Sequence, residues 1–155
     1  MAGEKRACMA GRGTNMPTYA ARRILLAPRA DVWAFLAEPH NLADWWPDIA
    51  GVQPDRRGLA PGARWHVVGP NRPGLIRKPQ ATGMLLVVEV EPQERISFQL
   101  TGDRIDARLR LRSVEELRTE VELEVSGPWL IGLSRRFPHR ALARLYALVQ
   151  TAAEA

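Results

Sequence analysis

Two segments in the second half of the chain alternate between uncharged and charged residues, and this alternation constrains the fold more than any other feature. In residues 104–112 and 117–126, almost every second side chain is apolar, while those between are mostly arginine, aspartate or glutamate. Successive side chains of a β-strand point to opposite faces of its sheet. The sequence therefore predicts two strands with one buried face and one wet face.

The charges on the wet face are of opposite sign on the two predicted strands. A hairpin centred on Glu115 would place Arg110 opposite Glu120 and Arg108 opposite Glu122. Each such exposed pair contributes only about 0.2–1 kcal/mol. We therefore interpret this charged pattern as a solvated sheet face, not as a surface that binds a partner.

Turn residues and hydrophobic periodicity divide the rest of the chain into further elements. Pro28, Pro39 and Pro47 bound two short helices, over residues 29–37 and 42–46. Residues 127–153 predict a long helix with an apolar face, opened by Gly127-Pro128 and kinked or divided at Pro138. The predicted strands are residues 18–27, 49–54, 63–69, 82–91, 94–101, 104–112 and 117–126.

Length, charge and cysteine content limit what such a chain can be. Its 155 residues suit a single domain, and we expect a disordered leader over residues 1–16 followed by a domain over residues 17–153. No apolar run reaches the length of a membrane-spanning helix. A lone cysteine, Cys8, excludes an internal disulfide and fits a cytoplasmic location.

The net charge of +5 raises the possibility of nucleic-acid binding. We rank it low, because the aromatic residues are not interleaved with basic ones on a strand face. The sequence predicts no particular oligomeric state.

Residues 24–52 resemble the START-like superfamily, and within it the branch of polyketide cyclases/dehydrases and lipid-transport proteins. The resemblance rests on an Ala-Pro after the first strand (Ala27-Pro28), a Val-Trp-x-Phe-Leu helix (residues 32–36) and a tryptophan ending the second helix (Trp46). Residues 88–100 and 127–133 are also similar to this family. One fold hosts many activities, so the resemblance indicates the fold more strongly than the function.

The resemblance implies an α+β helix-grip fold. In such a fold a curved seven-stranded antiparallel sheet wraps around a long C-terminal helix, with two short helices after the first strand. It also implies an apolar cavity between sheet and helix. The leading hypothesis is a protein that binds or carries a lipid, quinone or polyketide-like molecule. A cyclase/dehydrase-type enzyme, and a protein-interaction module with a filled cavity, remain as alternatives.

The alternation and the helix periodicity identify the side chains expected to face this cavity. Trp65 or His66 should point inward from its strand, but not both. The inward residues are expected to include Val90, Ile96, Ile105, Leu123, Leu145 and Val149. The candidate ligand-binding residues are Trp33, Trp65, His66, Val88, Phe98, Leu109, Leu111, Val121, Leu142 and Tyr146.

The basic stretch 56–78 adds a further expectation. With Trp46 it could form a lip at the cavity mouth that attracts an acidic amphiphile or briefly contacts an anionic membrane surface. The lip residues are Trp46, Arg72 and Arg77.

No pattern of catalytic or metal-binding residues accompanies the predicted cavity. The histidines His40, His66 and His139 lack the spacing of metal ligands, and there is no nucleophile elbow or phosphate-binding loop. The inward positions of the last two strands hold no acid or base. We therefore predict no metal, no cofactor and no catalytic residue, and we favour ligand binding over catalysis.

Overall fold

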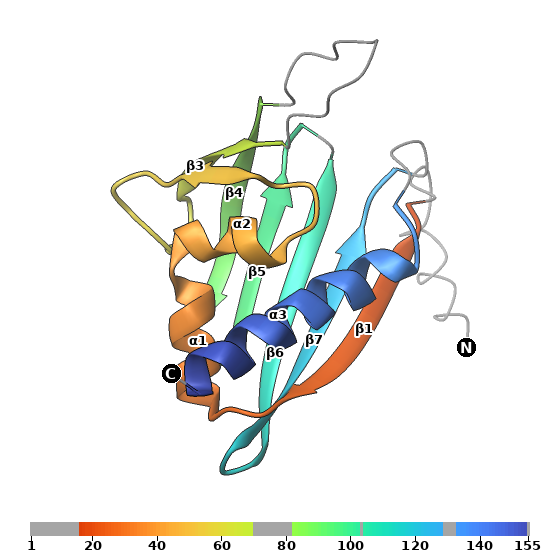
Figure 1. Cartoon of the computed structure of the whole chain (residues 1–155). Coiled ribbons are helices and arrows are strands. Elements are labelled where there is room, and N and C mark those ends of the chain that lie inside the picture. The colour runs from red at the N-terminus through yellow and green to blue at the C-terminus, as the bar shows by residue number, and fades with distance from the viewer. Residues whose placement is uncertain (1–15, 70–81, 103, 129–132, 155) are drawn as a thin grey trace, which may run out of the picture.

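Seven antiparallel strands form one sheet, and a long C-terminal helix crosses one of its faces (Figure 1). The computed structural model describes residues 16–69, 82–102, 104–128 and 133–154. The strand order is β1-β7-β6-β5-β4-β3-β2, with every neighbouring pair antiparallel. The elements are β1 (Thr18–Leu25), α1 (Arg29–Ala37), η2 (Pro39–Asn41), α2 (Leu42–Trp45), β2 (Gly51–Gln53), β3 (Arg64–Val68), β4 (Thr82–Glu91), β5 (Arg95–Leu100), β6 (Ile105–Glu115), β7 (Arg118–Ser126) and α3 (Arg136–Glu154).

The predicted helix-grip architecture is confirmed, because the sheet and its covering helix are both present. We call the face that α3 covers the inner face and the opposite one the outer face. Helix α3 lies closest to β1, α2 and β7 (Figure 1). The apolar residues of β6 and β7 that alternate with charges are buried on the inner face.

Helix α3 begins later than predicted. It starts at Arg136 and not at residue 127, so that Pro138 occupies its first turn. Proline has no N–H to donate, and inside a helix its ring clashes with the carbonyl of the fourth preceding residue, but the first turn avoids both problems. The predicted start of the helix was therefore wrong, because it placed Pro138 in the helix interior.

The hairpin of β6 and β7 has the predicted faces but a different register. Strand β6 extends to Glu115, and the pairs are Arg108 with Glu124, Arg110 with Glu122, and Arg112 with Glu120. The register therefore differs by two residues from the expected one. A shift of two keeps every side chain on its face, so the hydrophobic pattern could not detect it.

Val88 was expected to face inward, and this was wrong. A register shift in β4 between Val87 and Glu89 turns Val88 outward, where 48% of its surface is exposed. Leu85 and Val87 are buried instead. The continuous apolar run of residues 84–88 has no alternation that would show which residues point inward.

One buried hydrogen bond connects the sheet to the turn before α1. The hydroxyl of Thr119 in β7 donates to the carbonyl oxygen of Ala27, 2.8 Å away, and both residues are buried. An unpaired carbonyl at this depth is costly, because water cannot replace the lost donor.

We expect Thr119→Val to lower the free energy of unfolding by about 1–3 kcal/mol, since it removes this donor and keeps the shape. Urea unfolding measures the change. Thr101→Val is the matched control, because its hydroxyl also bonds a carbonyl, that of Met84 at 2.9 Å, but is exposed. The control should cost about 0.5 kcal/mol or less. Equal losses in the two variants would contradict the role of burial.

Candidate functional site

The inner face and α3 pack against each other through apolar side chains that form the hydrophobic core. Of the residues predicted to bind a ligand, Phe98, Leu109, Leu111, Val121 and Leu142 are buried there. Trp33 is half-buried and packs against the same core. The structure therefore brings most of the predicted set to the interior, with contributions from α1, α3 and the three strands β5, β6 and β7.

An aromatic cluster occupies the interior between α2, β5 and the start of α3. The ring of Trp46 meets those of Trp45, Phe98 and Phe137 edge-on, with centroids 5.5, 5.2 and 5.1 Å away. Edge-to-face contacts at such distances contribute about 0.5–1.5 kcal/mol beyond the buried area. This cluster joins the short helix to the sheet and to α3.

Trp46 was expected at the cavity mouth, and this was wrong. Only 2% of its surface is exposed, and Trp45 is buried as well. Both indoles fit inside because α2 ends at Trp45, and Trp46 has extended backbone angles that direct its side chain separately. The other two lip residues, Arg72 and Arg77, lie outside the described residues.

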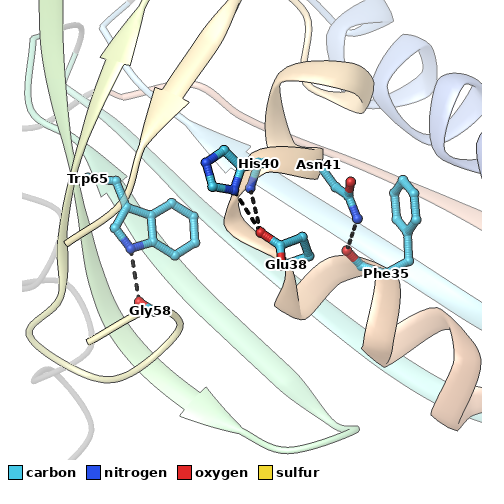
Figure 2. A network of polar contacts seen from close by, with 6 residues as sticks. All are labelled: Phe35, Glu38, His40, Asn41, Gly58 and Trp65. Atoms are coloured by element: carbon cyan, nitrogen blue, oxygen red, sulfur yellow. Dashed lines mark hydrogen bonds and ion pairs between the residues drawn. The ribbon is translucent and has the colours of Figure 1, made fainter. Parts of the chain in front are cut away.

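A polar corner between α1 and α2 positions these tryptophans. The side-chain amide of Asn41 donates to the carbonyl oxygen of Phe35, 2.9 Å away, and the Nδ1 atom of His40 lies 2.9 Å from the carboxylate of Glu38 (Figure 2). The hydrogen bonds from His40 hold the pKa of Glu38 below its usual range. His40 is exposed, so these contacts fix the local backbone and do not reach the interior.

Trp65 is the inward residue of β3, whereas His66 lies on the exposed outer face. His66 therefore does not face the interior. The indole N–H of Trp65 donates to the carbonyl oxygen of Gly58, 2.9 Å away, which ties the β2–β3 loop to the strand (Figure 2). Alternation permitted either residue to point inward, and the apolar ring occupies the buried position.

Asp55 holds the same loop through its carboxylate. It accepts hydrogen bonds from the backbone N–H groups of Arg64 at 3.0 Å and Arg57 at 2.9 Å. The bond from Arg64 is the main cause that lowers the pKa of Asp55, and the N–H and charge of Arg57 add to it. Desolvation acts in the opposite direction but does not prevail.

Tyr146 lies near the edge of the interior. The guanidinium of Arg23 in β1 stacks over its ring, 4.4 Å from the centroid. The residue is half-buried. One face of the ring is thus occupied by a cation, which limits its contact with a ligand to the other face and the edge.

Sequence reasoning missed several interior residues. Phe137 was not recognised, because the predicted helix began nine residues too early and the apolar face was assigned from later residues. Only one of Trp45 and Trp46 was expected in the core, whereas both are buried. Leu85 and Val87 were hidden by the unbroken apolar run of β4.

Polar chemistry is scarce in the interior. Among the described residues, Thr119 is the one polar or charged residue that is buried, and its hydroxyl already bonds Ala27. Within the same part of the chain, no group of three His, Cys, Asp or Glu side chains could hold a metal ion. None of the described helices is both long and apolar enough to cross a membrane.

We expect Trp46→Ala to lower the free energy of unfolding by about 3–5 kcal/mol. The reason is that it leaves a cavity among three aromatic rings. Chemical denaturation followed by circular dichroism measures the loss. Trp33→Ala, at a half-buried site, should cost clearly less. A similar cost for both would show that Trp46 does not organise the interior.

The lowered pKa of Asp55 predicts a pH dependence. Its stabilising contribution is present above the unfolded pKa of about 3.9 and is lost as the pH falls through the lower folded pKa. The stability difference between the wild type and Asp55→Asn should therefore be largest above pH ~4 and should shrink on acidification. Asp106→Asn, at an exposed site of β6, removes the same charge as a control. A constant difference across this range would contradict the assignment.

Comparison with known proteins agrees with this geometry. The search of curated proteins found no match. Protein NE0264 from Nitrosomonas europaea has a TM-score of 0.68 and 17% identity, covering 89% of this chain and 97% of its own. TTHA0849 from Thermus thermophilus has a TM-score of 0.67 and 16% identity, with 88% of this chain and 99% of its own covered.

A third solved structure is the di-domain ARO/CYC BexL from the BE-7585A biosynthetic pathway. Its TM-score is 0.69 and its identity 17%; the similarity covers 90% of this chain but 48% of BexL. Identities this low show a shared fold. The family model described as polyketide cyclase/dehydrase and lipid transport matches residues 16–150. The chain therefore belongs to the polyketide cyclase/dehydrase and lipid-transport family.

Proposed function

We propose that the protein binds or carries a small hydrophobic molecule between the inner face of the sheet and α3. The observation that carries this proposal is the apolar character of the interior. Among the described residues, every buried side chain except Thr119 is apolar, and the hydroxyl of Thr119 already has an acceptor. Pockets for small molecules are mostly apolar, with few polar groups that set orientation.

The family supports the same class of ligand, since its description includes lipid transport. A lipid, a quinone or a polyketide-like molecule would each present mainly apolar surface to this lining. We expect contacts from Trp33, Trp65 and Phe98, and from the edge of Tyr146. The aliphatic walls would come from Leu109, Leu111, Val121 and Leu142. His66 and Val88 are no longer candidates, because both face outward.

A cyclase/dehydrase-type enzyme is the alternative that the family description favours. Such chemistry needs an acid or base within hydrogen-bond reach of the substrate. The buried part of the described chain offers no ionisable side chain, which supports binding over catalysis. The protein-interaction alternative predicts an interior without room for a ligand, and the aromatic cluster around Trp46 fills part of it. The cytoplasmic location stays a prediction.

Native mass spectrometry, followed by solvent extraction, tests the proposal directly. We expect a co-purifying hydrophobic molecule, or saturable uptake of the neutral probe N-phenyl-1-naphthylamine with increased fluorescence. Trp33→Ala should weaken probe binding by about tenfold, because it removes a large apolar contact.

Leu117→Ala is the control for this experiment, since Leu117 is 65% exposed at the β6–β7 turn. It should leave probe binding unchanged. A wild type with no extractable molecule and no saturable uptake would refute the binding function. Equal weakening in the two variants would show that the probe sits on the exterior.

A further inference from the structure

The outer face of the sheet carries an open hollow of about 740 Å³ on the side away from α3. Five arginines and four glutamates line it, together with Leu111. The sequence predicts a solvated surface of mutually compensating charges here. Whether those charges neutralise one another depends on the strand register, which sets the residues that lie opposite each other.

A single row of side chains crosses five strands at the centre of this hollow. Pairing of neighbouring strands sets Arg22 opposite Glu122, Glu122 opposite Arg110, Arg110 opposite Arg95, and Arg95 opposite Glu91. Two arginines are therefore direct cross-strand neighbours at the middle of the row. Like charges placed directly opposite one another destabilise a sheet.

Ion pairs engage most charges of the hollow, including that of Arg95, but not that of Arg110 among the described residues. Glu122 pairs with Arg22, and Glu120 pairs with Arg112 at 3.1 Å. Arg95 pairs with both Glu91 at 2.6 Å and Glu89 at 3.2 Å. Within the described part of the chain, no carboxylate lies within ion-pair distance of Arg110 or Arg29. Glu94 forms no ion pair within the described residues, although its charge acts on Arg95. The arginines of the hollow that have no carboxylate partner in that part of the chain are therefore Arg110 and Arg29.

Two of these arginines also have unused donors. The Nε atoms of Arg29, at the start of α1, and of Arg95 are shielded from solvent and have no hydrogen-bond partner. A buried donor without an acceptor is costly, and proteins normally satisfy such groups. An acceptor from outside the chain would satisfy them.

We propose that this hollow, centred on Arg110 and Arg95 with Arg29 at its rim, binds a phosphate group. A tetrahedral oxyanion offers several acceptors at once, and guanidinium groups present paired donors that match it. Its negative charge would relieve the repulsion between Arg95 and Arg110. The phosphate is either free or carried by a small molecule, because the hollow is open and larger than one phosphate ion. This site is separate from the apolar interior.

Titration calorimetry and thermal unfolding with inorganic phosphate test the site, at an ionic strength held constant with chloride. We expect saturable binding and a rise in Tm that chloride does not produce. Arg110→Gln should weaken phosphate binding by about tenfold or more, the loss expected for a charge-assisted hydrogen bond. The free variant should have a Tm equal to or above that of the wild type. Among the described residues Arg110 has no ion-pair partner to lose, and its removal relieves the repulsion with Arg95.

Arg108→Gln is the matched control. Arg108 lies on the same strand and face, but opposite Ser97 and Glu124 and outside this hollow. It should bind phosphate like the wild type. If Arg110→Gln does not fold, Arg29→Gln should show the same loss of affinity.

Glycerol 3-phosphate, titrated in parallel, distinguishes the two sources of the group. Tighter binding of the ester than of inorganic phosphate indicates a phosphorylated small molecule, and the reverse indicates the free ion. The proposal is overturned if the wild type shows no saturable phosphate binding, or if the Arg108 and Arg110 variants weaken it equally. Neither result bears on uptake of the neutral probe by the interior.

Discussion

An antiparallel sheet with one apolar face must bury that face, and α3 is the long element available to cover it. The buried residues of β6 and β7 form the middle of the apolar face, and α3 lies over β1 and β7 beside them. Helix α3 does not cover the half of the sheet formed by β3, β4 and β5 to the same extent. There the α1–α2 segment supplies Trp45 and Trp46, whose rings bridge to Phe98 and Phe137. The candidate site follows from this division, since we propose that a ligand binds where the core residues of the sheet, α3 and the aromatic cluster meet.

The same alternation that creates the apolar face concentrates charge on the other one. Exposed ion pairs contribute little to stability individually, so a charged outer face needs no function to exist. What distinguishes the hollow is a mismatch at Arg110, which lies opposite Arg95 and has no carboxylate partner among the described residues. The neighbouring carboxylates pair with Arg95, Arg22 and Arg112 instead. Natural sequences tend to violate such local rules where a ligand supplies the compensation. The protein would then have two chemically opposite binding regions on the two faces of one sheet.

Several site residues were predicted correctly because the alternation of apolar and polar residues around them is visible in the sequence. Phe98, Leu109, Leu111 and Val121 alternate with polar neighbours, so their inward orientation could be read directly. The prediction for Val88 was wrong because its neighbours are also apolar, so the sequence does not show which of them point inward. A register shift in β4 then turns Val88 outward. The prediction for Trp46 was wrong for another reason. It was assigned to the cavity mouth, but the extended backbone after α2 lets it follow Trp45 into the core.

The sequence by itself determined the number and order of the strands, the apolar face of each strong strand and the presence of a covering helix. These features depend on local periodicity, on proline and glycine, and on the need to bury apolar surface. Only the tertiary structure decided the pairing register, the start of α3 and the filling of the interior by Trp46. The register is invisible locally because a shift of two residues leaves every side chain on its own face. Whether Arg110 meets a glutamate or another arginine is consequently a property of the assembled sheet, not of any segment of the chain.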